Sequence, residues 1–345
     1  MSAPRVLVRT DASVDIGLGH AMRCLAFVQA LADECGGTAE FLMLDPPPAF
    51  AARAVREGAA VRELRTGDAD ETVRLAEGAD WVVLDGYRFG GAYQRALVDA
   101  GLKLLAFDDH GHAGSYPAHL VLNQNLGAGP EPYADRAPYT RLLLGPRHAL
   151  LRREFRVWEG APRSVPAVAR RVLVTLGGSD PDNVSARVLA ALGDVDGPLE
   201  VQLLIGGANP HEEALERAAA ACPHPVELAV DVLDVPERMA WADLAVAAAG
   251  GSSWELARVG TPQIAIVLAD NQRPAGRALG EQGLAVSLGW HADVSAGDIA
   301  RAVAGLAADA ARRADLSRRG QELIDGRGAL RVLSAMGLTT EVAAA

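Results

Sequence analysis

Cysteine is scarce in this chain, with three residues among 345. They stand at Cys24, Cys35 and Cys222, which is an odd number at scattered spacings. This pattern fits neither a disulfide framework nor the closely spaced ligand pairs of a zinc site. The scarcity therefore argues against a disulfide-rich secreted domain, and we expect no bound metal and no cofactor.

Positive charge is also in short supply. Lys and Arg total 33 against 44 Asp and Glu, so the net charge is −11. An acidic surface disfavours non-specific binding to nucleic acid and to anionic membranes, so we expect neither partner. A phosphorylated ligand remains compatible, because it needs only a local electropositive spot. No apolar run is long enough to span a bilayer, and the N-terminus does not resemble a signal peptide. We expect a cytoplasmic protein and make no prediction of its oligomeric state.

The length and the apolar pattern predict two α/β domains. A chain of 345 residues exceeds what one hydrophobic core usually serves. Short apolar runs typical of strands alternate with helical patterns, which predicts a doubly wound parallel sheet in each half, that is, two Rossmann-like domains. The predicted strands are residues 5–8, 39–44, 60–64, 81–84, 103–107, 120–123, 141–144, 171–176, 200–205, 226–229, 244–247 and 263–267.

The domain boundary is predicted from composition. Residues 158–169 contain proline and glycine and have little periodicity, so we interpret them as a linker. The predicted domains are then residues 1–157 and residues 170–345. Three helical patterns, beginning at Ile299, Arg312 and Ala329, close the second domain.

A glycine-rich loop near the N-terminus is the first candidate site. The predicted strand at residues 5–8 leads into Gly17, Gly19 and His20, and a helical pattern runs over residues 21–31. Backbone N–H groups at a helix N-terminus attract anions, and a histidine placed there can accept a proton. The alternatives are glycines that only turn the chain and a histidine that only caps or packs.

The second half offers two further loops at predicted strand ends, where open parallel sheets bind their ligands. Residues 249–253 read Ala-Gly-Gly-Ser-Ser, and a helix is predicted to follow with Glu255 in its first turn. Small residues at a helix start can hold a diphosphate. Glu255 could accept hydrogen bonds from a ribose or could simply complement the helix dipole.

One βα unit later, Asp270, Asn271 and Gln272 either cap a helix or bind the ligand. Gly178, after the first strand of this half, is another candidate. Asp108, Asp109, His110 and His112 could suggest a metal site, which we do not expect.

Several motifs together resemble a known family, the UDP-2,4-diacetamido-2,4,6-trideoxy-β-L-altropyranose hydrolases of pseudaminic acid biosynthesis and the related spore-coat polysaccharide proteins. The motifs are RTDAS and GLGHAMRCLAFVQAL near the start, VLDGY at 83–87, FDD at 107–109, LNQN at 122–125, LLGPRHALLRREF at 143–155, VLVTLGGSDPDN at 172–183 and AAGGSSWELARVGTPQIAIVLADNQ at 248–272. The resemblance implies a glycosyltransferase-B-like fold.

The resemblance also implies residue roles. Catalysis falls on His20 as the base and on Tyr87. Gly86 and the loop at residues 250–253 depart from the family pattern close to the expected sugar, so the sugar is left open. The expected substrate-binding residues are Gly17, Gly19, Arg23, Gly178, Gly250, Ser252, Ser253, Glu255, Asn271 and Gln272.

The sequence thus predicts a metal-independent hydrolase that cleaves a UDP-linked amino- or deoxy-sugar into UDP and free sugar. UDP is expected on the second domain, and His20 is expected to activate a water for attack at C1 of the sugar. Two alternatives remain open: a UDP-sugar-dependent glycosyltransferase, and a nucleotide-sugar binding protein without catalysis.

Overall fold

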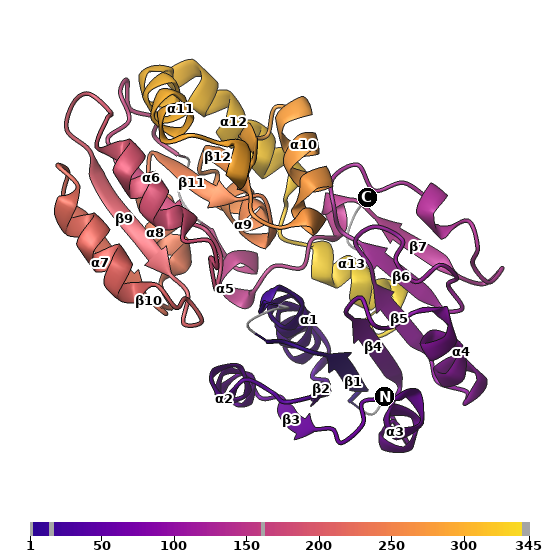
Figure 1. Cartoon of the computed structure of the whole chain (residues 1–345). Helices are drawn as coiled ribbons and strands as arrows, with labels where there is room; N and C mark the ends of the chain where they lie inside the picture. The colour runs from indigo at the N-terminus through magenta and orange to yellow at the C-terminus, as the bar shows by residue number, and fades with distance from the viewer. Residues whose placement is uncertain (1–2, 14–16, 160–162, 340–345) are drawn as a thin grey trace. The chain divides into compact units, whose positions relative to one another are not determined.

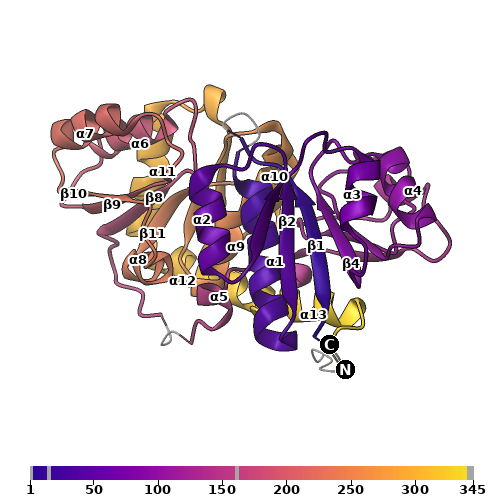
Figure 2. The same cartoon turned by 90° about the horizontal axis from the view of Figure 1, so that it is seen from below.

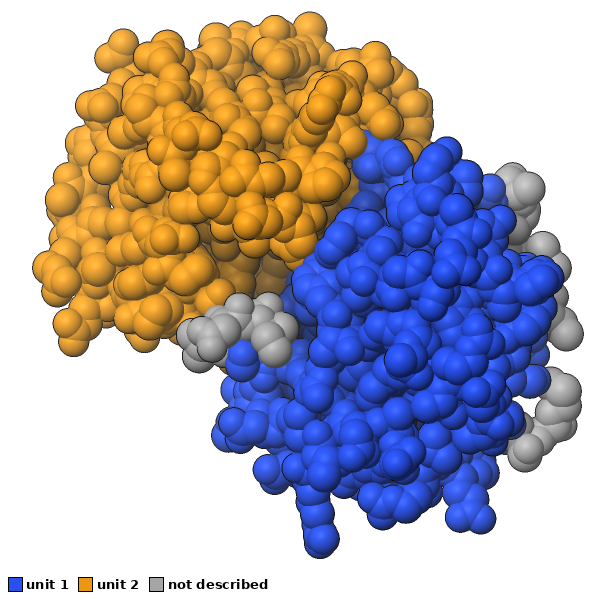
Figure 3. All heavy atoms as spheres, turned by 45° about the vertical axis from the view of Figure 1, so that its right-hand side comes forward, with its two compact units in different colours: residues 1–156, 326–345 blue, residues 157–325 orange. Residues whose placement is uncertain are grey.

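The structure is a computed structural model that describes residues 3–13, 17–159 and 163–339. The chain divides into two compact units, shown in different colours in Figure 3. Unit 1 comprises residues 1–156 and 326–345, and unit 2 comprises residues 157–325. Each unit has its own sheet. No helix in the described residues is both long enough and apolar enough to cross a membrane.

In unit 1 the described residues form a seven-stranded sheet in the order β3-β2-β1-β4-β5-β6-β7. Every neighbouring pair is parallel. The strand order reverses between β1 and β4, which is where doubly wound sheets place their ligands. The strands are β1 (Arg5–Thr10), β2 (Thr38–Met43), β3 (Ala60–Glu63), β4 (Trp81–Asp85), β5 (Leu104–Phe107), β6 (Leu120–Asn123) and β7 (Arg141–Leu144).

Helices cover both faces of this sheet, so its central strands are continuous apolar runs. Val6, Leu7 and Val8 of β1 are 0% exposed. Figure 2 shows α1 (Gly19–Cys35) alongside β1 and β2. The other helical segments are α2 (Pro48–Arg56), α3 (Ala69–Leu75), α4 (Gly91–Asp99), α5 (Arg153–Arg156), α13 (Gly328–Ala335) and the 3₁₀ turns η1 (Glu131–Tyr133) and η2 (Pro146–His148).

Unit 2 repeats the plan with six described strands in the order β10-β9-β8-β11-β12-β13. All pairs are again parallel, and the order reverses between β8 and β11. The strands are β8 (Arg171–Thr175), β9 (Glu200–Ile205), β10 (Val226–Val230), β11 (Leu244–Ala248), β12 (Gln263–Val267) and β13 (Val286–Trp290).

The helices of unit 2 form two layers. Helix α6 packs against α7 and α11, while α9 packs against α8 and α12 (Figure 1). Their bounds are α6 (Val184–Leu192), α7 (Glu212–Ala221), α8 (Val235–Trp241), α9 (Gly251–Val259), α10 (Arg273–Glu281), α11 (Ala296–Ala308) and α12 (Ala310–Leu323), with the 3₁₀ turns η3 (Asp270–Gln272) and η4 (His291–Asp293). The predicted fold class, α/β with two doubly wound sheets, is therefore confirmed.

The C-terminal helix corrects the predicted domain boundary. The sequence placed residues 170–345 in one domain, but residues 326–345 belong to unit 1. Helix α13 packs against α1, and Val332 and Leu333 are completely buried in the unit 1 core. The amphipathic pattern of α13 predicted a helix correctly, but such a pattern does not specify which sheet the helix covers.

Because α13 completes unit 1, trimming its buried face should destabilise that unit. We expect Leu333→Ala to lower the free energy of unfolding by about 2–5 kcal/mol, the usual range for a buried leucine. Urea titration gives this value, and hydrogen exchange in α1 shows whether unit 1 carries the loss. Ser334→Ala, at a half-buried position of the same helix, is the control. Equal unfolding midpoints for the two variants would contradict the assignment.

Candidate active site

A histidine and an aspartate meet at the carboxyl edge of the unit 1 sheet, where the strand order reverses. His20 is the second residue of α1, and Asp85 is the last residue of β4. The two strands are paired so that Thr10 lies opposite Asp85, which brings the start of α1 to the end of β4. The His20 Nδ1 atom lies 2.7 Å from Asp85 Oδ1. His20 is 7% exposed and Asp85 is 1% exposed, so the pair is buried.

The glycines before His20 lie at an open position. Gly17 has a φ of +78°, a conformation that side chains disfavour. A Cβ at Gly17 or at Gly19 would have no neighbour within 4 Å among the described atoms. Gly19 is the first residue of α1. The predicted glycine-rich helix start is therefore present, while residues 14–16 of the loop lie outside the described residues.

Arg23, one turn further along α1, joins two carboxylates. Its Nε donates to Asp85 Oδ2 at 2.9 Å, and its Nη2 donates to Asp85 Oδ1 at 2.7 Å. Its Nη1 donates to Asp109 Oδ1 at 2.7 Å. Bidentate pairing of this kind is strong and fixes orientation. The sequence predicted that Arg23 binds substrate, but in the structure its guanidinium binds these two aspartates.

Burial and the neighbouring charges determine the protonation of the His20–Asp85 pair. Burial opposes protonation of His20, but the adjacent Asp85 outweighs burial and raises the pKa of His20 above its ordinary value. Burial also disfavours the Asp85 anion, yet Arg23 and His20 hold the pKa of Asp85 well below its usual range. Asp85 is therefore an ionised carboxylate that accepts a hydrogen bond from the Nδ1–H of His20. The Nε2 atom is left as the nitrogen that can accept a proton.

Tyr87 stands beside the dyad. Its ring meets the His20 ring edge-on, with centroids 4.9 Å apart, and its hydroxyl donates to Asp109 Oδ2 at 3.1 Å. The side chain is 41% exposed, so it lies at the surface of the site. His110 and His112 contact the same ring, at centroid distances of 5.1 and 5.3 Å. The structure thus brings the two predicted catalytic residues together.

Asp108 and His112 form a second carboxylate–imidazole pair, with Asp108 Oδ2 2.7 Å from His112 Nδ1. Burial disfavours the Asp108 anion, but His112 and the hydroxyl of Tyr116 hold the pKa of Asp108 well below its usual range. The described residues contain no group of three or more His, Cys, Asp or Glu side chains that could hold a metal ion.

In unit 2, the predicted small-residue loop lies between β11 and α9, at the carboxyl edge of that sheet. Helix α9 begins at Gly251, so its first N–H groups belong to this loop. Ser252 is half-buried. Ser253 is completely buried, and its hydroxyl donates to the Ala248 carbonyl at 3.2 Å. The side chain of Ser253 therefore supports the loop from inside.

Glu255 is the fifth residue of α9, and no acidic residue lies in the first turn of that helix. The prediction that Glu255 lies in the first turn is therefore wrong. The helix dipole acts mainly within the first turn, so it gives a weaker reason for a carboxylate at this position. Glu255 is half-buried.

The loop after β12 lies next to Gly250, in the loop between β11 and α9. Gln272 accepts the Leu268 N–H through Oε1 at 3.0 Å. A Cβ added to Gly250 would lie 3.4 Å from Gln272 Nε2, so the amide group stands next to Gly250. Asn271 is exposed in the 3₁₀ turn between β12 and α10. The structure thus brings Gly250 and Gln272 together.

Gly178 lies at the same edge, after β8. A Cβ at Gly206, which follows β9, would stand 2.5 Å from the Gly178 Cα, so the two loops meet backbone to backbone. Gly177, beside them, has a φ of +92°. Three glycine-containing loops therefore line the carboxyl edge of the unit 2 sheet.

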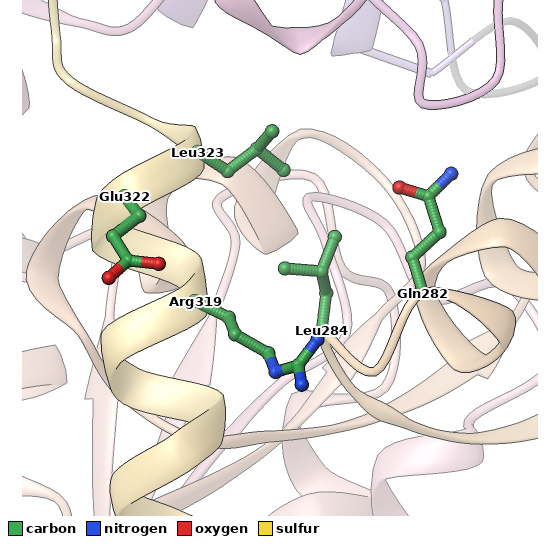
Figure 4. Close-up of a pocket in the computed structure, with 5 residues that line it drawn as sticks. All are labelled: Gln282, Leu284, Arg319, Glu322 and Leu323. Carbon is green, nitrogen blue, oxygen red and sulfur yellow. The ribbon is translucent and has the colours of Figure 1, made fainter.

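A shallow cavity of about 250 Å³ also lies in unit 2 (Figure 4), below the usual range for ligand pockets. Gln282 and Leu284 precede β13, so the cavity lies at the amino end of that strand, away from the glycine loops. The other lining residues are Arg319, Glu322 and Leu323 of α12. We do not assign the cavity to the candidate site.

Sequence reasoning assigned no role to the partners of His20 and Arg23. Asp85 is the last residue of the buried strand β4, and Asp109 lies two residues after the buried strand β5. Asn125 Nδ2 donates to Asp109 Oδ1 at 3.1 Å. A carboxylate directly after an apolar strand at the strand-order reversal was the signal that could have identified Asp85.

No protein-family model matches the chain. The spore coat polysaccharide biosynthesis protein SpsG of Bacillus subtilis is 28% identical over 195 residues, covering 56% of this chain and 57% of SpsG. An uncharacterized protein of Methanocaldococcus jannaschii is 22% identical over 277 residues, covering 78% of this chain and 57% of that protein. The chain thus spans little more than half the length of these curated relatives.

Solved structures resemble the chain over nearly its whole length. MurG of Acinetobacter baumannii has a TM-score of 0.68 at 16% identity, covering 97% of this chain and 100% of MurG. The calicheamicin glycosyltransferase CalG4 has a TM-score of 0.62 at 19% identity and full coverage of both chains, 100% and 100%. Anabaena HepE in complex with UDP-glucose scores 0.64 at 14% identity, covering 96% and 98%. These likenesses show a fold of the glycosyltransferase-B type.

Proposed function

We propose that this protein is an enzyme that uses a UDP-sugar and transfers the sugar to a hydroxyl acceptor. The buried His20–Asp85 pair, at the position where doubly wound sheets bind ligands, is the observation that carries the proposal. The glycosyltransferase-B fold supports a nucleotide-sugar substrate, and the similarity to SpsG supports a role in polysaccharide biosynthesis.

In the proposed reaction, His20 Nε2 removes the proton from the attacking hydroxyl. Asp85 holds the imidazole by Nδ1 and stabilises the imidazolium that forms. The hydroxyl oxygen bonds to C1 of the sugar as the bond from C1 to the β-phosphate oxygen breaks, and UDP leaves with the electron pair. A positioned base of this kind contributes roughly 10²–10⁴-fold to the rate.

Unit 2 holds the nucleotide in this proposal. The N–H groups at the start of α9, directly after Gly250, bind the diphosphate and stabilise the negative charge that develops on it. Glu255 accepts hydrogen bonds from the ribose, and Asn271 and Gln272 contact the sugar. Tyr87 contacts the sugar or the acceptor from unit 1.

Hydrolysis is the second candidate function, in which water replaces the acceptor hydroxyl. The combined GLGH and ADNQ motifs favour it, and it is the function predicted from the sequence. The comparisons favour transfer instead, because the structural neighbours named here include a glycosyltransferase. Both reactions would use the same base and the same leaving group.

The acceptor decides between these functions. The purified protein is incubated with a panel of UDP-sugars, with and without sugar and lipid-linked acceptors, and UDP release is measured. We expect release to rise at least about tenfold when a suitable acceptor is added, corresponding to about 1.4 kcal/mol of added transition-state binding. Equal release without acceptor would establish hydrolysis, and binding of a UDP-sugar without release would establish a non-catalytic binding protein.

A further inference from the structure

Arg23 is placed where it can act on His20 through their shared partner. Asp85 Oδ1 receives both the His20 imidazole and the Arg23 Nη2, each at 2.7 Å. The same Nη2 lies only 3.3 Å from His20 Nδ1. Both nitrogens are donors toward Asp85, so the guanidinium and a protonated imidazole would repel each other at this distance.

We propose that Arg23 is a positioning residue that sets the basicity of His20, and that Asp109 offsets part of its effect. Arg23 partly neutralises the negative charge that Asp85 presents to His20. Asp109 in turn partly neutralises the positive charge of Arg23. This inference rests on the proposed role of His20 as the base. It goes beyond that role because it states that Arg23 determines the pH range in which His20 can act as a base.

The charge balance of the cluster supports this. Asp85, Asp109 and Arg23 together carry one net negative charge, which a proton on His20 would neutralise. Burial opposes a charged imidazole, Asp85 raises the pKa of His20 most strongly, Arg23 lowers it, and Asp109 raises it again. Without Arg23, the carboxylates of Asp85 and Asp109 would act on the imidazole with no cation between them, and His20 would keep its proton to a higher pH than in the wild type. A protonated His20 cannot act as a base.

The other charged and titratable groups around His20 are few among the described residues. The thiol of Cys24, on α1, donates to Asp85 Oδ2 at 3.5 Å. Tyr87 contacts the imidazole from the turn after β4, and His110 and His112 contact the Tyr87 ring. Helix α5 also packs on α1, but its Arg153 and Arg156 bind Asp33, more than three turns from His20.

Titration of His20 by NMR tests the inference without substrate. The chain contains eight histidines, so the His20 signal is assigned by its loss in His20→Asn. We expect Arg23→Gln to raise the pKa of His20 by about 1 pH unit and Asp109→Asn to lower it by a similar amount, as expected for charges within a few ångströms in a partly buried site. Arg23→Lys keeps the positive charge, so the pKa of His20 in this variant should stay close to the wild-type value.

The opposite signs make the outcome decisive. A His20 pKa that is unchanged in both variants, or that moves the same way in both, would overturn the inference. If Arg23→Gln fails to fold, Asp109→Asn and Arg23→Lys still test it. The acid limb of the activity profile should shift with the NMR value. If His20 titration shifts but the activity profile does not, the proposed base is wrong while the influence of Arg23 stands.

Discussion

Replacement of His20 by Asn is expected to lower turnover by about 10²–10⁴-fold while UDP affinity and fold are retained. The asparagine amide can still donate to Asp85 from the position of Nδ1, so the buried carboxylate keeps a partner. No atom replaces Nε2, so proton acceptance is lost. Steady-state kinetics measures the loss, and calorimetry with UDP measures the affinity.

His110→Asn is the matched control, because His110 is exposed and contacts the ring of Tyr87. It should retain most of the activity. The pH profile adds a sign. Because the pKa of His20 is raised by Asp85 against the effect of burial, activity should fall as pH drops through a value above the ordinary imidazole pKa of about 6.5. Less than about tenfold loss in His20→Asn would contradict the role of His20 as a base.

Glu255→Ala should weaken UDP binding by roughly 10–100-fold, the effect of losing a hydrogen bond made by a charged group. The reason is the proposed contact between its carboxylate and the ribose, from a half-buried position on α9. Calorimetry on the full chain gives the affinity. Glu213→Ala removes an equally charged but highly exposed carboxylate, with a side chain 91% exposed, and should not change binding. Equal affinities in the two variants would refute the ribose contact.

Much of the fold could be predicted because its strands are short apolar runs between helical patterns. The predicted runs at residues 5–8 and 81–84 became β1 and β4 with small changes at their ends. Strand β13 was missed. Ser287 and Gly289 interrupt its apolar pattern, the pairing with β12 is irregular at this point, and the strand is half-buried at the sheet edge.

The site was predicted only in part, for physical reasons. His20 could be identified because the glycines and the helix start are local in sequence. The partners of His20 and Arg23 were missed, because Asp85 lies 65 positions away from His20 and Asp109 lies 86 positions away from Arg23. Only the parallel sheet brings these strand ends together. For Ser253 the local pattern was visible, but it does not determine the direction of the side chain. A hydroxyl in a small-residue loop can point toward a ligand or into the protein, and this one points into the protein.

The position of α13 has a consequence for synthesis of the protein. Unit 1 begins the chain but obtains Val332 and Leu333 only after all of residues 157–325 have been made. At typical ribosomal speeds, translating that stretch takes roughly 10–30 s. During this interval the apolar side chains of α1 that pack against α13 lack that partner, whereas all of unit 2 has been made before α13 is. The last step of folding is therefore expected to be the docking of α13 onto unit 1, after the whole of unit 2 has been synthesised.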